Sequence, residues 1–319
     1  MTRLPARPAP SPQRGMTLIE MMISMLLGLI VVGGVVGIFI ANSETHRRTD
    51  DLARIQENAR VAMQLIGRSM REAGGNPCGL PPDRGLIFLS TELKEGNWWL
   101  GGKDFKEALK GYMSGDQFPA SGSAVSSDAV ITVSGNLFVK TVTADDPPSG
   151  AMKIPSRAGL ANHDILFACS TTMGRGVVFK TSGITGAGTN WSVNRTDSFD
   201  GLVKNLSATT LGKLNAEGWF VGDNGRGGSS LFRAFIGDNG QPEEIAADVT
   251  RMRITYLLPN ADQYVPANQI DADDWTKVIA AYIELTLSRS AGNQATIERT
   301  VGLTVNLRNR FNPKKSDPP

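Results

Sequence analysis

The sequence is poor in the residues on which metal and enzymatic chemistry depend. Its 319 residues include two histidines and two cysteines, and it has neither a C-x-x-C pair nor an H-E-x-x-H motif, so no metal site is expected. Aromatic residues make up 7% and the formal net charge is +2, which argues against a base-stacking platform and gives no strong basic field for nucleic acid. We find no candidate catalytic residue. We therefore expect a non-catalytic protein without a cofactor that does not bind nucleic acid directly.

Proline and charge are missing from one long stretch near the amino terminus. Residues 21–41 contain neither, and about 21 residues in a helix span the roughly 30 Å hydrocarbon core of a bilayer. The leader, residues 1–15, carries Arg3, Arg7 and Arg14 and no acidic residue, which favours a cytoplasmic location. The apolar stretch is longer than that of an ordinary secretory signal. A single membrane-spanning helix is predicted.

Glu20 places a carboxylate at the start of this apolar stretch. A charged group inside a membrane costs about 2 to 4 kcal/mol on insertion scales, so such groups usually face a partner or a polar cavity. One interpretation places Glu20 at the membrane surface, in contact with headgroups. The other requires a partner cation.

Residues 15–20, Gly-Met-Thr-Leu-Ile-Glu, followed by the apolar stretch, resemble the class III signal of type IV pilins and type II secretion pseudopilins. The resemblance implies that a prepilin peptidase cleaves after Gly15 and methylates the new amino terminus on Met16, where the family more often has Phe. It also implies that Glu20 is essential to assembly, since the ammonium group of an incoming subunit can pair with the Glu20 carboxylate of its neighbour. At an effective dielectric near 20 two such charges 4 Å apart attract by about 4 kcal/mol, which is comparable with the insertion cost.

An amphipathic pattern continues beyond the apolar stretch. Apolar residues recur at three- and four-residue spacing; they are Leu52, Ile55, Ala59, Ala62, Ile66, Met70 and Ala73. Residues 16–73 lack proline, and Gly74 and Gly75 supply a stop, so one helix of about 58 residues and roughly 87 Å is predicted. Residues 16–42 would form its membrane and assembly part and residues 43–75 its amphipathic continuation. The apolar stripe packs either on the protein's own sheet or between subunits.

Short β-branched segments separated by Gly, Asn, Asp and Ser predict a β-rich domain over residues 76–311. The first strand candidates are residues 129–135, 137–143, 164–169, 176–181, 219–222 and 231–237. Three further candidates are residues 249–258, 277–289 and 295–308. These three alternate apolar and polar residues, as in an antiparallel meander with one buried face. The fold class is therefore α+β, a long N-terminal helix packed on an antiparallel C-terminal domain, and residues 312–319 are expected to be a disordered tail.

Cys78 and Cys169 both fall on the predicted extracytoplasmic side, which favours a disulfide. The bond would close a loop of about 92 residues, for which the chain-entropy model gives roughly 4 to 5 kcal/mol of stabilisation. Two buried free thiols and an intermolecular bond are the alternatives.

Two further features have two interpretations each. Trp98 and Trp99 lie in an apparent loop between glycines, where they form either an exposed contact site or core packing by at least one ring. Acid-rich stretches at residues 222–228, 236–244 and 271–274 suit either calcium or turns. The Asn-Gly pairs favour turns, because these residues readily adopt turn conformations.

The C-terminal strands and residues 52–60 also resemble the PilW-type minor pilins. This resemblance implies a minor pilin that takes part in assembly or initiation of a type IV pilus, in support of motility, adhesion or DNA uptake. It would be held in the bacterial inner membrane with its C-terminal domain in the periplasm, and would then enter the surface pilus. Its partners would be other minor and major pilins, the prepilin peptidase and the inner-membrane assembly machinery. The alternatives are a minor pseudopilin of type II secretion and a membrane-anchored adhesin.

Overall fold

The structure is a computed structural model. It describes residues 15–78, 86–89, 98–100, 108–142, 144–146, 151–157, 159–170, 175–196, 209–236, 241–289 and 296–310. The expected leader up to residue 14 and the expected tail lie outside the described residues. The chain divides into two compact units, one ending at Arg54 and one beginning at Ile55, and each is described by itself.

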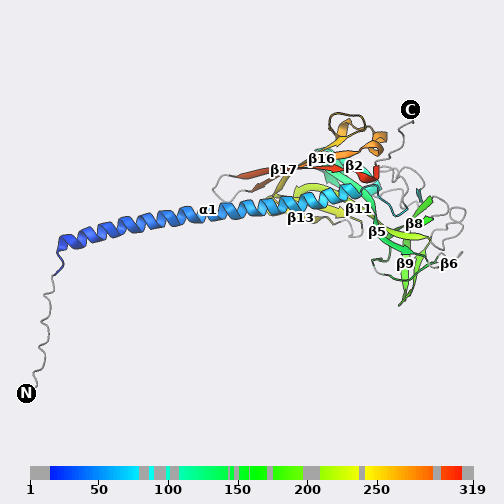
Figure 1. The fold of residues 1–319 in the computed structure, drawn as a ribbon, viewed down its shortest axis with the longest axis horizontal. Helices are drawn as coiled ribbons and strands as arrows, with labels where there is room; N and C mark the ends of the chain where they lie inside the picture. The colour runs from blue at the N-terminus through cyan, green and yellow to red at the C-terminus, as the bar shows by residue number, and fades with distance from the viewer. Residues whose placement is uncertain are drawn as a thin grey trace, which may run out of the picture. The chain divides into compact units, whose positions relative to one another are not determined.

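Helix α1 (Leu18–Glu72) is a single element of 55 residues (Figure 1). At 1.5 Å of rise per residue it is about 82 Å long, close to the predicted length. Gly74 follows it with φ 78°, a left-handed conformation that glycine adopts without a Cβ clash and that commonly ends helices. Its amide then donates to the carbonyl of Val133 at 2.8 Å, which attaches the end of the helix to the sheet.

In the first unit the apolar side chains of α1 have no protein cover. From Met16 to Ile40 the exposed fraction of the large apolar residues ranges from 50% at Val36 to 78% at Leu18. A polar segment follows, in which Glu44 and Arg48 form an ion pair at 2.8 Å. This unit therefore presents an uninterrupted apolar helix surface followed by a charged one.

The second unit contains the predicted antiparallel meander. Its four-stranded sheet has the order β15-β14-β16-β17, formed by β14 (Val249–Leu257), β15 (Val265–Pro266), β16 (Ala280–Arg289) and β17 (Ile297–Asn306). All its neighbouring strands are antiparallel. The 3-10 helices η3 (Ala267–Gln269) and η4 (Ala272–Lys277) lie between β15 and β16. The strand predicted to begin at residue 277 therefore begins at Ala280.

An eleven-stranded sheet contains most of the remaining strands, with a main order of β13-β12-β11-β8-β9-β10-β7-β6. Its members are β1 (Leu86–Phe88), β2 (Leu109–Tyr112), β5 (Ala129–Thr141), β6 (Ala144–Asp146), β7 (Ala151–Ile154), β8 (Ile165–Ser170), β9 (Arg175–Ala187), β10 (Asn190–Arg195), β11 (Thr210–Asp223), β12 (Ser229–Phe235) and β13 (Glu243–Ala247). Strands β3 (Gln117–Phe118) and β4 (Ser123–Ala124) form a separate pair. Pairing is antiparallel except between β1 and β9. The two strands predicted at residues 129–143 form one strand, β5, because β11 pairs with both of its ends, at residues 130–136 and at residues 140–141, on either side of a register shift.

The predicted stripe on α1 packs on the protein's own meander from Ile55 onward. Its buried members share one core with the inner faces of β14 and β16; they are Ile55, Ala59, Ala62, Ile66 and Met70. Gly67 lets the helix lie close to the sheet, because a Cβ at this position would lie only 2.7 Å from the side chain of Leu303. Of the two interpretations of the stripe, packing on the protein's own sheet holds for this part of the helix.

A buried polar cluster also links α1 to the eleven-stranded sheet. The hydroxyls of Ser69 on α1 and Thr132 on β5 are 2.5 Å apart. The indole N–H of Trp219 on β11 donates to Ser69 Oγ at 3.1 Å and to Glu217 at 3.2 Å. Because buried polar groups must find partners, this cluster favours one rotation of the helix on the sheet.

Candidate functional site

Gly15 and Met16 lie just outside helix α1 and belong to no regular element. The side chain of Met16 is 69% exposed, and no atom of the described residues lies within 4 Å of a Cβ placed on Gly15. The peptide bond at which the sequence predicts cleavage is therefore open on the side of Gly15 and free of helical hydrogen bonding. That geometry is compatible with the approach of a protease.

Thr17 and Glu20 form the start of the helix. The amide of Glu20 donates to the Thr17 carbonyl at 3.1 Å and, more weakly, to its hydroxyl at 3.4 Å. Thr17 thus occupies the N-cap position, and the acidic Glu20 lies in the first turn, where the helix dipole favours negative charge. We did not predict this local role from the sequence, although the Thr-x-x-Glu spacing is the pattern of a capping box.

The apolar part of α1 satisfies the length and composition of a membrane span. An 18-residue window reaches a mean hydropathy of 2.7 with none of its residues buried. Four glycines in this part, Gly28, Gly33, Gly34 and Gly37, have no atom within 4 Å of the position that a Cβ would occupy. Small residues of this kind let two helix backbones approach closely inside a membrane.

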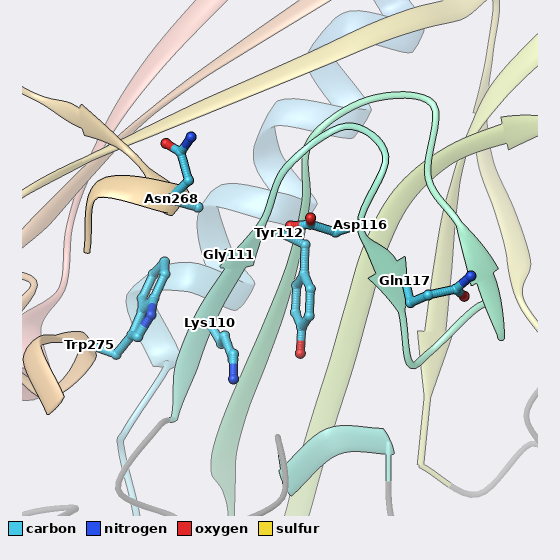
Figure 2. A pocket seen from close by; sticks show the side chains of 8 residues that line it. Lys110, Gly111, Tyr112, Asp116, Gln117, Asn268 and Trp275 are labelled. Carbon is cyan, nitrogen blue, oxygen red and sulfur yellow. The ribbon is translucent and has the colours of Figure 1, made fainter. Parts of the chain in front are cut away.

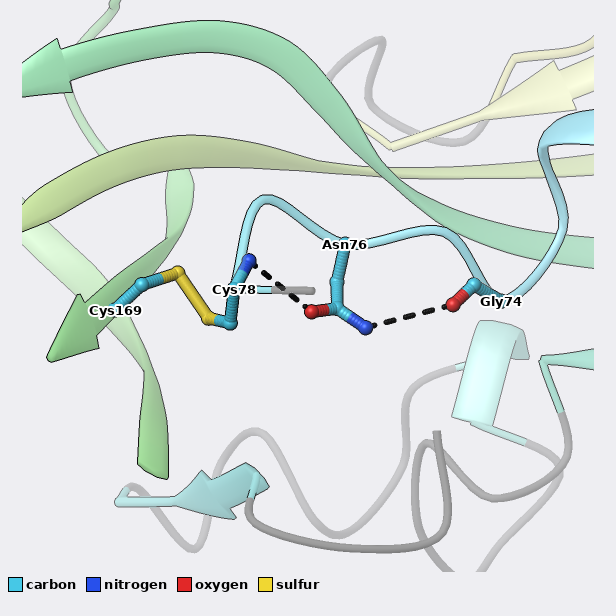
Figure 3. Close-up of a disulfide and its surroundings, with 4 residues drawn as sticks. All are labelled: Gly74, Asn76, Cys78 and Cys169. Carbon is cyan, nitrogen blue, oxygen red and sulfur yellow. Dashed lines mark hydrogen bonds between the residues drawn. A yellow bond between two sulfur atoms is a disulfide. The ribbon is translucent and has the colours of Figure 1, made fainter. Parts of the chain in front are cut away.

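A disulfide joins Cys78 to Cys169 on β8 across 91 residues of sequence (Figure 3). The turn before it is ordered by Asn76, whose side chain accepts from the Cys78 amide at 3.1 Å and lies 3.5 Å from the Gly74 carbonyl. A Cβ on Gly176 would lie 2.6 Å from the sulfur of Cys78, so the bond fits beside a residue without a side chain. The disulfide fastens the chain just beyond the end of α1 to the eleven-stranded sheet.

Trp98 and Trp99 both pack against the core, as the second interpretation expects of at least one ring. They lie in the 3-10 helix η1 (Trp98–Leu100), where Trp99 is 3% exposed and Trp98 packs partly buried against the same core. Space for the Trp98 ring comes from Gly218 on β11, where a Cβ would lie 3.2 Å from that ring. The core interpretation is correct, and it depends on a glycine far away in the sequence.

The acid-rich stretch at residues 222–228 forms the turn between β11 and β12. Asp223 accepts from the Gly225 amide at 2.7 Å, and Asn224 accepts from the amides of Arg226 and Gly228 at 2.9 and 3.2 Å. These side-chain oxygens therefore stabilise the turn itself. Among the residues that the structure describes, no group of three or more His, Cys, Asp or Glu side chains is placed to hold a metal ion.

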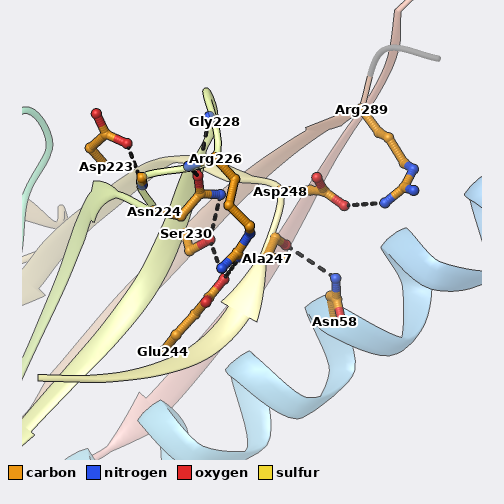
Figure 4. A network of polar contacts seen from close by, with 11 residues as sticks. Asn58, Asp223, Asn224, Arg226, Gly228, Ser230, Glu244, Ala247, Asp248 and Arg289 are labelled. Carbon is orange, nitrogen blue, oxygen red and sulfur yellow. Dashed lines mark hydrogen bonds and ion pairs between the residues drawn. The ribbon is translucent and has the colours of Figure 1, made fainter. Parts of the chain in front are cut away.

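Ion pairs hold this turn and the adjoining strands together (Figure 4). Arg226 contacts Glu244, and Ser230 donates to the same carboxylate at 2.7 Å; these hydrogen bonds lower the pKa of Glu244. Arg289 pairs with Asp248 at 2.8 Å where the chain passes from β13 into β14. These contacts are structural, since every charged group named here already has a protein partner.

A cavity of about 390 Å³ lies beside β2, η3 and η4. Figure 2 shows Trp275 and Asn268 on one side of β2 and Asp116 and Gln117 on the other. The Asp116 carboxylate is already used by the Met113 amide at 2.8 Å, and Trp275 is 4% exposed. The lining is therefore mostly engaged in holding the fold.

Three features together are typical of pilin-like proteins. An open peptide bond precedes helix α1, an acidic residue lies in its first turn, and an antiparallel domain packs on its second part. Comparison with known families agrees with that class. Residues 10–36 match the prokaryotic N-terminal methylation motif, and residues 218–315 match the family Type IV Pilus-assembly protein W. The chain thus carries a prepilin methylation motif and a PilW-type pilus-assembly domain in its C-terminal third. No curated protein and no solved structure matches it.

The two matches fall on the segments from which the prepilin signal and the antiparallel meander were predicted. The first spans Gly15, Met16, Glu20 and most of the apolar stretch. The second spans the end of β11 and all of the meander. The second match is to a pilus-assembly family and not to a type II secretion family, and Trp99, one of the two rings named for the adhesin alternative, is buried.

Proposed function

We propose that this protein is a minor pilin, cleaved between Gly15 and Met16, methylated on Met16 and built into a type IV pilus from the inner membrane. The observation that carries the proposal is the different environment of the two parts of one helix. From Leu18 to Ile40 the large apolar side chains of the helix are uncovered, whereas its stripe from Ile55 onward is buried by the protein's own sheet. The exposed large apolar side chains of the helix, which suit contact with other subunits or lipid, therefore lie in its first part.

Glu20 supplies the specific contact in this proposal. Cleavage would place a new ammonium group on Met16, four residues before Glu20, and α1 would carry both charges at the edge of its apolar surface. Within one chain the helix start is already capped by Thr17. The carboxylate of Glu20 is therefore available for the ammonium of a neighbouring subunit, an attraction of about 4 kcal/mol at an effective dielectric near 20.

The proposed partners and location follow from this mode of assembly. The protein would contact the prepilin peptidase at residues 15 and 16, and other minor and major pilins through the apolar part of α1. The inner-membrane assembly machinery would move it from the membrane into the pilus, with the β-rich domain in the periplasm and then at the cell surface. Its role would be initiation or support of assembly, without catalysis.

Replacement of Glu20 by Gln tests the proposal. We expect Glu20→Gln to reduce the amount of the protein in sheared surface filaments, measured by immunoblotting against its amount in the membrane. Glu44→Gln is the matched control, because it removes one carboxylate from the exposed, polar part of the same helix. Equal incorporation of the Glu20 variant and the control would contradict the proposed role of Glu20.

A further inference from the structure

A polar groove lies beside the four-stranded sheet, at β14 and the segment that leads into β5. Its volume is about 570 Å³. The polar side chains among its lining residues are Ser114, Ser126, Ser127, Asp128, Thr250, Arg251 and Arg253. We call it the arginine groove.

The two arginines lie on the side of β14 that faces away from the core. Met252 and Ile254 are each 1% exposed and belong to the core shared with α1, whereas Arg251 and Arg253 are exposed. Residues two apart in a strand point to the same face, so both guanidinium groups project from one surface about 7 Å apart along the strand. This surface stays open when α1 packs on the opposite face of the sheet.

Neither guanidinium has a hydrogen-bond or ion-pair partner within the described part of the chain. Three other arginines of this unit do have one: Arg226 contacts Glu244, Arg233 contacts Glu243 at 2.7 Å and Arg289 contacts Asp248 at 2.8 Å. An arginine presents planar donors that match a carboxylate, so two unpaired arginines in one groove are suited to an anionic ligand.

Short hydrogen bonds join the segment near Ser127, which forms the wall of the groove, to β14 at Met252, which forms its floor. Ser127 Oγ lies 2.6 Å from both the carbonyl and the amide of Met252, and the amide of Ile254 donates to Asp128 at 2.9 Å. The main chain that carries the arginines is therefore held on this side as well as by β16 on the other. A preformed site of this kind loses little conformational entropy on binding.

The local charge balance limits the kind of anion. Asp128 is 9% exposed and lines the groove, while Glu284 lies directly across the ladder from Arg253. Thr286, which is neutral, lies across from Arg251. Two arginines with two nearby carboxylates give no strong positive field, which disfavours a polyanion such as nucleic acid. A segment with one or two carboxylates among neutral residues fits this balance.

We propose that the arginine groove binds an extended acidic segment of a partner polypeptide, with Arg251 as the main anchor and Arg253 as the second. In an extended segment, carboxylates two residues apart have the same spacing as the two arginines. The hydroxyls of Ser114 and Ser126 line the path of the neutral residues of that segment. Identifying the partner as another pilus subunit rests on the proposed function, whereas the binding itself does not.

The test uses the purified full-length, uncut chain in detergent and a labelled peptide, Gly-Glu-Ser-Glu-Gly, followed by fluorescence polarisation. The peptide Gly-Gln-Ser-Gln-Gly tests whether the carboxylates are required. The double variant Arg251→Gln with Arg253→Gln is compared with Arg60→Gln with Arg299→Gln, which removes the same charge from exposed positions outside the groove. Thermal unfolding of each variant shows whether the fold is intact.

We expect the glutamate peptide to bind saturably and the groove variant to bind it about tenfold more weakly, as for the loss of charge-assisted hydrogen bonds. The control pair should change the affinity by less than about twofold. Replacement of both groove arginines by Lys should give an intermediate loss of affinity, because lysine keeps the positive charge but lacks the planar, forked donors of the guanidinium group.

No saturable binding, equal losses in the groove and control variants, or equal binding of the glutamine peptide would overturn the proposal. Stronger binding of a single-stranded oligonucleotide than of the peptide would also overturn it, in favour of a nucleic-acid ligand. Because the chain is used uncut and outside a filament, the outcome is independent of cleavage and assembly. A failure of the proposed function would therefore leave this result unchanged.

Discussion

The side chain of Asn309 donates to the backbone carbonyl of Glu72 at 3.2 Å, across 237 residues of sequence. It also lies 3.4 Å from the carbonyls of Arg71 and Ala73. The last carbonyls of a helix have no partner within the helix, so Asn309 caps the end of α1. The last helical turn, β17 and the 3-10 helix η5 (Arg308–Arg310) are thereby joined.

Replacement of Asn309 by Ala should lower the free energy of unfolding by about 1 kcal/mol, the usual net value of such a hydrogen bond. Asn306→Ala is the control, since Asn306 is exposed at the end of β17 and makes no such contact with the helix. Thermal unfolding of both variants measures the difference. Equal midpoints would show that the cap does not contribute to stability.

Ser69→Ala should destabilise the protein by about 1 to 3 kcal/mol, because it removes a partner from the buried groups of Thr132 and Trp219. The cluster is enclosed, with Ser69 6% and Trp219 0% exposed. The exposed Gln64 on the same helix provides the control variant Gln64→Ala. Urea titrations followed by tryptophan fluorescence compare the two; an unchanged midpoint for Ser69→Ala would mean that the cluster does not stabilise the helix position.

Loss of the disulfide should cost about 2 to 5 kcal/mol, as for other native disulfides that close long loops. We expect the double variant Cys78→Ser with Cys169→Ser to melt at a lower temperature than the oxidised protein. Reductant should lower the melting temperature of the parent protein and leave that of the double variant unchanged. If reductant lowers the melting temperature of both proteins equally, the disulfide is not the cause of the parent protein's higher melting temperature.

Tyr256 should make stability fall at high pH. Burial, and to a lesser extent the charge of Asp128, raise the pKa of its hydroxyl well above 10.0. The unfolded chain then loses the proton first, so stability is full below pH 10.0 and is lost as the pH rises from there toward the folded pKa. Tyr256→Phe should reduce this decline.

The same variant should cost little at neutral pH. The Tyr256 hydroxyl is buried, and within the described residues it has no hydrogen-bond partner. Removing an unpaired buried hydroxyl leaves the surrounding packing intact, including the edge contact with Trp275 at 5.0 Å between ring centroids. Denaturant titrations at neutral pH and above pH 10.0 give both comparisons; a large loss at neutral pH would indicate a polar partner for this hydroxyl.

Elements with a clear local pattern were predicted well. The continuous helix follows from the absence of proline and the regular stripe, and the meander follows from the alternation of apolar and polar residues in β14, β16 and β17. The length of β11 was not predictable in this way. It contains Gly212, Asn215 and Gly218, which weaken a strand pattern locally, and Gly218 is required only because Ala120 and Trp98 pack against it.

The functional residues show the same difference: some could be predicted from the sequence and others could not. The segment from Gly15 to Glu20 could be found because it is contiguous in the sequence. The arginine groove could not, since its wall near Ser127 and its floor at Met252 come together only through contacts across 125 residues. Pairings of this kind depend on tertiary structure, on which a single sequence carries no local signal.

Cleavage after Gly15 is the central claim, and intact mass measures it most directly. The protein would be extracted from membranes of cells with and without prepilin peptidase. We predict that peptidase removes residues 1–15 and leaves a methylated Met16, and that without peptidase the full chain remains. An uncut chain in both strains would contradict the account and leave a membrane-anchored binding protein as the better interpretation.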